Sequence, residues 1–250
     1  MKKYQLFNIF LLVLLILVTI FFSSLTIPVQ AKEHKGFALV ELFTSEGCSS
    51  CPPADEAVAK ITKEAGDHVF VLGFHVDYWN YLGWKDEFSN PSFTSRQNLY
   101  AQHFNLNSIY TPQVIVNGKK EFVGSSESLL RKTVEQQLEE SPPSVIFLAA
   151  KTNGNRTVTV TCKSGKDNSF VTNIALVQQQ AVSHVKRGEN EGRELKHINL
   201  VRDFKTITGP EGTVSLTIPD GLNNKDCFVV AYLQNKNSLE ISSAAKTAIQ

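Results

Sequence analysis

The chain has 250 residues, of which 42% are hydrophobic and 20% are charged. This composition is that of a globular protein and excludes a disordered or collagen-like chain. Lysine and arginine total 25 against 24 acidic residues, whereas a nucleic-acid-binding protein carries a basic excess or patch. We therefore expect no nucleic-acid partner.

Residues 1–31 have the layout of a secretory signal peptide. A charged start over 1–3 precedes a largely apolar run over 9–22 and a small-residue ending at Ala31. The run is shorter than the ~20 residues that a membrane-spanning helix needs, although a retained anchor is the alternative. We expect removal of residues 1–31, no stable membrane anchor afterwards, and export to the periplasm, the cell envelope or the extracellular space.

The segment 37–140 predicts alternating strands and helices. Apolar runs of strand length at 37–43 and 69–76 enclose a helix over 54–65. An irregular, aromatic-rich insertion follows. The Asn117-Gly118 turn between 114–116 and 122–123 then predicts a hairpin, and residues 126–140 predict an amphipathic helix. The order is β-α-β, insertion, β-β-α.

The pattern changes after Pro142-Pro143. No convincing helix follows, and regularly spaced short strands predict an antiparallel sheet or sandwich. We therefore divide the chain into a signal peptide at 1–31, an α/β domain at 32–141 and an all-β, sandwich-like domain at 142–250. The predicted strands of the last domain lie at 145–150, 157–162, 170–177, 213–218 and 227–233.

The main chemical signal is Cys48-Ser49-Ser50-Cys51. A C-x-x-C at the junction of a strand and a helix is the redox arrangement of the thioredoxin fold. Two cysteines so spaced close a disulfide readily, and a helix N-terminus favours the thiolate. We expect Cys48, at the surface, to attack and Cys51 to resolve the mixed disulfide. The prolines that follow place the helix start between Ser50 and Pro53.

A Thr-Pro pair and a buried acid extend this catalytic prediction. Thr111 and Pro112 immediately precede the hairpin, where a cis-proline would face the dithiol and shape the edge on which an extended substrate pairs. Glu41 interrupts an apolar strand, and a buried carboxylate there would deprotonate Cys51. The alternative for Glu41 is a position on an edge-facing side of the strand.

Polar and aromatic residues after the second strand are candidate substrate-binding groups. His75 ends a parallel strand and Asp77 follows it, so this pair should lie near the dithiol on the same rim of the sheet, unless the two belong to a capped loop. Trp79 and Trp84 come from the aromatic insertion and would form a wall beside the dithiol, or pack in a core. The segment 187–193 is a polar loop between strands, or folds back to shape a cleft.

The remaining cysteines predict a structural disulfide between Cys162 and Cys227, because both fall in strands of a protein expected to be exported. Two buried free thiols would give the same pattern. A soft metal ion held by Cys48, Cys51, His75 and Asp77 is an alternative use of the dithiol, but we assign no metal ligands and expect no cofactor.

Several stretches resemble one family. Residues 40–55 (VELFTSEGCSSCPPAD) are similar to the exported thioredoxin-like family called domain of unknown function 1223, as are residues 75–79, 82–86, 110–113, 187–193 and 199–202. The resemblance covers nearly all of residues 37–245. It implies an α/β thioredoxin-like domain followed by a β-rich one, and it implies no particular substrate. Unlike ordinary thioredoxins, the chain has Gly47 before the first cysteine and Ser-Ser between the two.

We therefore expect an exported thiol–disulfide oxidoreductase-like protein whose partners are protein thiols or disulfides. A non-catalytic binding module with a structural Cys48–Cys51 disulfide is the second hypothesis. A copper or zinc carrier is the third.

Overall fold

The computed structural model describes residue 4 and residues 36–140, 145–154, 156–209 and 211–250. Apart from residue 4, the expected signal peptide lies outside the described residues, as do its cleavage site and the expected domain boundary between residues 141 and 142. The chain from His34 to Gln250 forms one compact unit. None of the described helices is long and apolar enough to cross a membrane.

The described elements comprise α-helices, short 3-10 helices (η) and strands. In chain order they are β1 (Ala38–Thr44), α2 (Pro52–Ala65), η1 (Gly66–His68), β2 (Val69–His75), η2 (Asn80–Leu82), α3 (Pro91–His103), β3 (Gln113–Val116), β4 (Lys120–Val123), α4 (Glu127–Leu138), β5 (Ile146–Thr152), β6 (Thr157–Ser164), β7 (Phe170–His184), β8 (Glu194–Thr208), β9 (Glu211–Thr217), η3 (Asn224–Asp226), β10 (Cys227–Asn235) and β11 (Ile241–Ala248).

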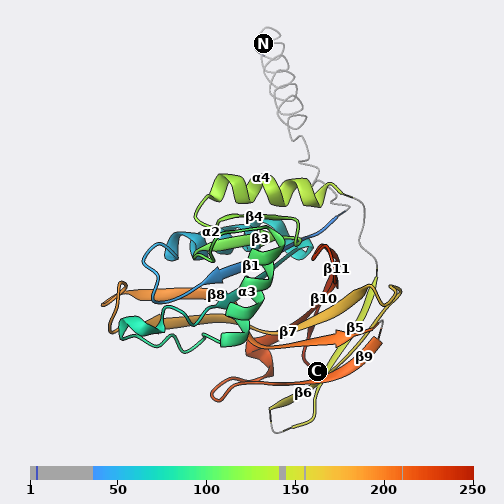
Figure 1. Ribbon diagram of the computed structural model, residues 1–250. Helices are drawn as coiled ribbons and strands as arrows, with labels where there is room; N and C mark the ends of the chain where they lie inside the picture. Colours follow the sequence, from blue (N-terminus) through green and yellow to red (C-terminus); the bar gives the residue numbers. More distant parts are fainter. Residues whose placement is uncertain (1–3, 5–35, 141–144, 155, 210) are drawn as a thin grey trace. The chain divides into compact units, whose positions relative to one another are not determined.

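A mixed eight-stranded sheet dominates the fold, in the order β11-β10-β7-β8-β2-β1-β3-β4 (Figure 1). β1 is parallel to β2 and antiparallel to β3. β8 pairs antiparallel with β7 over most of its length and meets β2 in parallel at Gly73 and Leu200. A second sheet has three antiparallel strands in the order β5-β6-β9.

The expectation of an α/β thioredoxin-like domain followed by a separate all-β, sandwich-like domain is wrong. Strands from both halves of the chain share the eight-stranded sheet, because β8 inserts between β7 and β2. No strand was predicted over residues 194–208, where β8 lies, and without β8 nothing joined the two sets of strands. The aromatic insertion also contains a helix that was not predicted, α3.

Three apolar clusters hold these layers together. Helices α2 and α4 cover one face of β1–β4, where Val40 and Leu42 point toward them. On the opposite face, alternate β1 residues such as Leu39 and Phe43 pack with α3. The three-stranded sheet packs on one face of β7 and β10 through a third cluster. Strand alternation thus assigns odd-numbered and even-numbered β1 residues to different cores.

The predicted Asn117-Gly118 turn is confirmed and also binds the C-terminal strands. Both residues have positive φ, 48° and 65°, as a tight hairpin turn requires. A Cβ on Gly118 would lie 2.0 Å from the carbonyl oxygen of Leu239, in the turn between β10 and β11. The backbone N–H of Ile241 donates to the Asn117 carbonyl at 2.9 Å. A glycine is therefore required where the two hairpins meet.

Candidate redox site around Cys48 and Cys51

Cys48 and Cys51 form a disulfide at the start of helix α2, with their Cα atoms 5.4 Å apart. Cys51 is the N-cap residue and the helix begins at Pro52, within the predicted interval. Ser49 and Ser50 are exposed, but both cysteines have no exposed surface. The expectation that Cys48 lies at the surface is therefore wrong.

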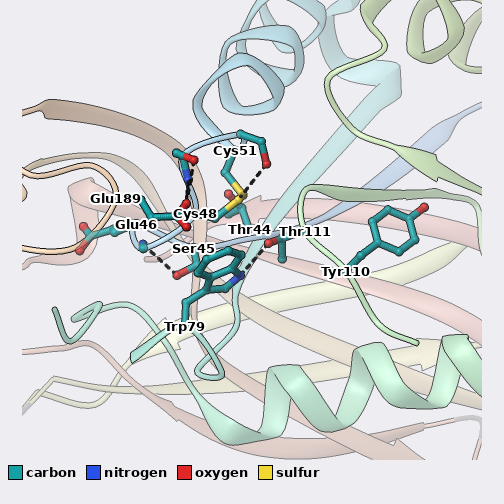
Figure 2. The surroundings of a disulfide bond; sticks show 12 residues. Thr44, Ser45, Glu46, Cys48, Cys51, Trp79, Tyr110, Thr111 and Glu189 are labelled. Atoms are coloured by element: carbon teal, nitrogen blue, oxygen red, sulfur yellow. Dashed lines mark hydrogen bonds between the residues drawn. A yellow bond between two sulfur atoms is a disulfide. The ribbon is translucent and has the colours of Figure 1, made fainter. Parts of the chain in front are cut away.

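The loop between β7 and β8 folds back onto the dithiol, as one of the two sequence interpretations proposed. Glu189 accepts hydrogen bonds from the backbone N–H and the hydroxyl of Ser49, at 3.1 Å and 2.7 Å (Figure 2). These bonds hold the pKa of Glu189 below its usual value. The buried Asn190 side chain donates to the carbonyls of Glu46 and Cys48, at 2.8 Å and 3.0 Å. We call residues 185–193 the covering loop.

The Thr111–Pro112 peptide bond is cis, as predicted, and Trp79 connects it to the dithiol. The indole N–H of Trp79 donates to the Thr111 hydroxyl at 2.8 Å. A Cβ on Gly47 would lie only 3.0 Å from the Trp79 Cβ. Figure 2 shows the indole beside the disulfide and reaching toward Thr111, whereas Tyr110 points away. Trp79 and Thr111 thus lie beside the disulfide, while the Pro112 ring is buried.

A buried polar cluster lies behind the dithiol loop. Glu46 accepts a 2.7 Å hydrogen bond from the indole of Trp84, and its backbone N–H donates to Asp86 at 2.9 Å. Asp86 also bonds Nδ1 of His75 at 2.7 Å. Burial alone would raise the pKa of Asp86, but His75 and two backbone N–H groups outweigh it and lower the pKa. Trp84 therefore contacts Glu46 directly, and His75 is linked to it through Asp86.

His197 on β8 joins this cluster. Its Nε2 lies 3.7 Å from the Glu46 carboxylate and its Nδ1 lies 3.9 Å from Asp55 on α2. Asp55 also accepts a hydrogen bond from Thr44 at the end of β1. The His197 ring packs edge-on against His75, with centroids 4.8 Å apart.

Glu41 does not lie where a proton relay to Cys51 needs it. It points to the α3 face of the sheet, opposite α2. Its carboxylate pairs with Arg96 at 2.7 Å and 3.1 Å and accepts hydrogen bonds from the hydroxyls of Tyr100 and Tyr232. All four side chains are buried. We correct the assignment of Glu41 to a structural role in the core.

Asp77 also differs from its predicted role. Its carboxylate accepts a hydrogen bond from Thr94 of α3, and its backbone N–H donates to the same hydroxyl. The alternative reading of Asp77, a residue that holds a loop, is the one that these contacts favour.

The predicted disulfide between Cys162 and Cys227 is not formed, and both residues are buried free thiols. Cys162 on β6 lies beside Thr172 of β7, which pairs with Leu233 of β10. Cys227 is six residues from Leu233 along the same strand, about 20 Å away at the usual strand rise. Burial raises the pKa of both thiols, that of Cys227 to about 11. Both thiols are therefore predominantly protonated at neutral pH.

Two further observations bear on ligands. Within the described part of the chain, no group of three or more His, Cys, Asp or Glu side chains is arranged to hold a metal ion. A groove of about 820 Å³ lies beside α2 and between β2 and β10, and its walls include Val69, Gln179, Phe228 and Lys246. None of the residues around the Cys48–Cys51 disulfide lines this groove.

Sequence reasoning missed five residues of the site, which come from four different segments. A buried-strand pattern at 195 and 197 was the available signal for the histidine, since Leu195 and His197 alternate as inward-facing residues do. Glu189 and Asn190 lie in the segment 187–193, for which folding back was one of the two interpretations, although neither residue was singled out. Glu46 and Asp55 gave no signal beyond their place in the family-like stretches. The five residues are Glu46, Asp55, Glu189, Asn190 and His197.

Comparison with known proteins identifies a matching family and a similar solved structure. The family model described as "Protein of unknown function (DUF1223)" matches residues 39–234, and no curated protein matches the chain. The chain is similar to a crystal structure of an Agrobacterium tumefaciens protein from a structural genomics consortium. The two are 30% identical with a TM-score of 0.65, and the match covers 88% of this chain and 96% of that one.

A second solved structure is a domain of the outer membrane lipoprotein Omp28 from Porphyromonas gingivalis. It is 14% identical, with a TM-score of 0.25, over 42% of this chain and 87% of that one. This likeness is too low to support an argument about fold or function.

Proposed function

The chain belongs to the DUF1223 family, whose description assigns no activity, and we propose that it is an exported thiol–disulfide oxidoreductase acting on protein thiols or disulfides. The observation that carries this proposal is the Cys48–Cys51 disulfide at the N-terminus of α2. Helix N-termini stabilise thiolates through their free N–H groups and their dipole. A disulfide between cysteines three positions apart at a helix N-terminus suits thiol–disulfide exchange.

In the proposed reaction the Cys48 thiolate attacks a substrate disulfide. A bond forms between Cys48 and one substrate sulfur, and the other substrate sulfur leaves as a thiolate. The Cys51 thiolate then attacks Cys48, closes the protein disulfide and releases the second substrate thiolate. Two electrons pass from the protein dithiol to the substrate, and the reverse sequence oxidises a substrate dithiol.

The contacts of Cys48 favour it as the attacking sulfur. The Ser50 hydroxyl lies 3.4 Å from the Cys48 sulfur, where it can donate a hydrogen bond to a thiolate. Cys51 is the N-cap residue of α2, and its carbonyl accepts from the backbone N–H groups of Ala54 and Asp55. Because neither sulfur is exposed, exchange with a protein requires the packing around the sulfurs to open, and we propose that the covering loop is the segment that moves.

The site also supports a local likeness to thioredoxin-fold oxidoreductases. A C-x-x-C between strand and helix and a cis-proline before β3 are both present. We propose this likeness for the site alone. Export is proposed from the signal-peptide layout of residues 1–31 and agrees with the Cys48–Cys51 disulfide, since disulfides persist in oxidising compartments.

An equilibrium redox titration tests the proposed function. The protein is incubated in dithiothreitol buffers of graded potential, and alkylated Cys48 and Cys51 are counted by peptide mass. We expect one two-electron transition above about −300 mV, in the range of exchange-active disulfides. The buried thiols of Cys162 and Cys227 serve as internal controls, because their alkylation should not follow the buffer potential.

One observation favours a second candidate function. Both sulfurs are fully buried, as in a structural disulfide, which would make the protein a partner-binding module. A transition below about −300 mV in the same titration would support this second function and contradict the first.

A further inference from the structure

The Cys48–Cys51 disulfide has a carboxylate on each flank. Glu46 lies two residues before Cys48 and is fully buried, and Asp55 follows Cys51 by one helical turn. Residues i and i+4 share one helix face, with Cβ atoms about 5–6 Å apart, so Asp55 adjoins Cys51. Both carboxylates converge on the ring of His197, at 3.7 Å and 3.9 Å.

The His197 ring is buried and charged. Burial alone would lower the pKa of His197, but Asp55 and Glu46 outweigh it and raise the pKa to about 9. The ring is therefore an imidazolium at neutral pH. Its other neighbours are the His75 ring with its partner Asp86, the Ser183 hydroxyl at 3.4 Å, and the Phe88 ring. The guanidinium of Arg202 also lies over the Phe88 ring.

We propose that His197 is a positioning residue of the dithiol: its positive charge, held by Glu46 and Asp55, stabilises the thiolate released at Cys51 when the disulfide opens. No contact joins His197 directly to a sulfur, so it acts through the carboxylate beside Cys51. The inference rests on the proposed function, because it describes how that exchange is assisted.

The step that His197 assists is disulfide opening. An external thiolate attacks the Cys48 sulfur, a new S–S bond forms there, and the Cys48–Cys51 bond breaks. The electron pair of the broken bond stays on Cys51 as a thiolate, which later takes a proton from water. Without His197 this negative charge would form beside Asp55 and Glu46 with no compensating cation. A leaving thiolate of lower pKa departs faster, so the imidazolium should accelerate opening.

The pH profile of disulfide reduction tests this role. Oxidised protein is reduced by dithiothreitol between pH 6 and 10, and each rate constant is divided by the thiolate fraction of the reagent. For the wild type we expect the normalised rate constant to fall as pH rises through about 9. His197→Gln should be slower by at least about threefold at pH 7 and should show no such fall. His184→Gln, which removes an exposed histidine from β7, should match the wild type.

A measurement on the wild type keeps the inference testable if His197→Gln does not fold. Coupling between two sites is reciprocal, so the pKa of His197, followed by NMR, should be higher in the reduced protein than in the oxidised one. Equal titration in both states, or a wild-type rate profile identical to that of His197→Gln, would overturn the inference. Failure of the proposed function is distinct, because the Cys48–Cys51 transition would then lie below about −300 mV in the redox titration, whatever the pH profile of the reduction rate.

Discussion

Replacing His197 with glutamine should remove a pH-dependent part of the stability. The pKa of His197 rises from its ordinary value of 6.5 to about 9 in the folded chain. A group whose pKa is raised on folding stabilises fully below its unfolded pKa, and this stabilisation disappears as pH rises through the folded pKa. At about 1.4 kcal/mol for each pKa unit, the imidazolium contributes about 3 kcal/mol below pH 6.5 and almost nothing above pH 10.

Urea denaturation of the oxidised protein at several pH values measures this contribution. The difference in unfolding free energy between wild type and His197→Gln should be about 3 kcal/mol larger at pH 6 than at pH 10. His184→Gln provides the matched control, since that side chain is 74% exposed, and its difference from wild type should stay small throughout. A loss in His197→Gln that is equal at both pH values would refute the reasoning and indicate lost packing instead.

Three further predictions concern the core, the covering loop and export. Glu41→Ala leaves Arg96 buried without its carboxylate partner, so the unfolding free energy should fall by about 3–5 kcal/mol. The reduction potential of the Cys48–Cys51 disulfide should stay constant, and a shifted potential would restore the proton-relay assignment. Glu189→Gln weakens the hydrogen bonds to Ser49 and should speed reduction of the Cys48–Cys51 disulfide by dithiothreitol, whereas Glu191→Gln in the same loop should not. Equal rates for the two variants would show that the covering loop does not limit access to the disulfide. N-terminal sequencing of the exported protein should begin at Lys32, and full-length chain in the membrane fraction would contradict cleavage.

Local signals in the sequence predicted local structure well. The C-x-x-C spacing predicted the disulfide, and the two prolines that follow it predicted the helix start. The Thr-Pro pair predicted the cis bond. The Asn117-Gly118 turn followed from its need for positive φ at both residues. In each case a few adjacent residues carry the whole physical cause.

Features that depend on distant partners were not predictable in this way. β8 was not predicted because its alternation of inward-facing and outward-facing residues is interrupted. Asn199 has a positive φ of 52°, and the pairing with β7 shifts register between Leu176 and Val177. The strand is nevertheless the one that unites the two halves of the sheet. Glu41 illustrates the same limit, since a buried carboxylate was correctly expected but its partner Arg96 lies 55 residues away.

The covering loop and His197 show why the site was only half predicted. The covering loop contacts the dithiol segment from more than 130 residues away, and His197 contacts Glu46 and Asp55 across a similar separation. Their positions therefore follow from the sheet order and not from nearby residues. Cys48 was expected at the surface because it precedes the helix. The burial of Cys48 results from tertiary packing around the segment that carries the dithiol.

Trapping of mixed disulfides tests the central claim most directly. Cys51→Ser removes the resolving thiol, so Cys48 should remain covalently bound to partner proteins in complexes that appear on non-reducing gels and vanish with dithiothreitol. Cys48→Ser should form none, because Cys51 lacks the Ser50 hydroxyl that adjoins the Cys48 sulfur. Trapped complexes from Cys51→Ser alone would confirm an exchange centre with Cys48 as nucleophile. Absence of complexes from both variants would contradict the catalytic assignment and leave a structural disulfide.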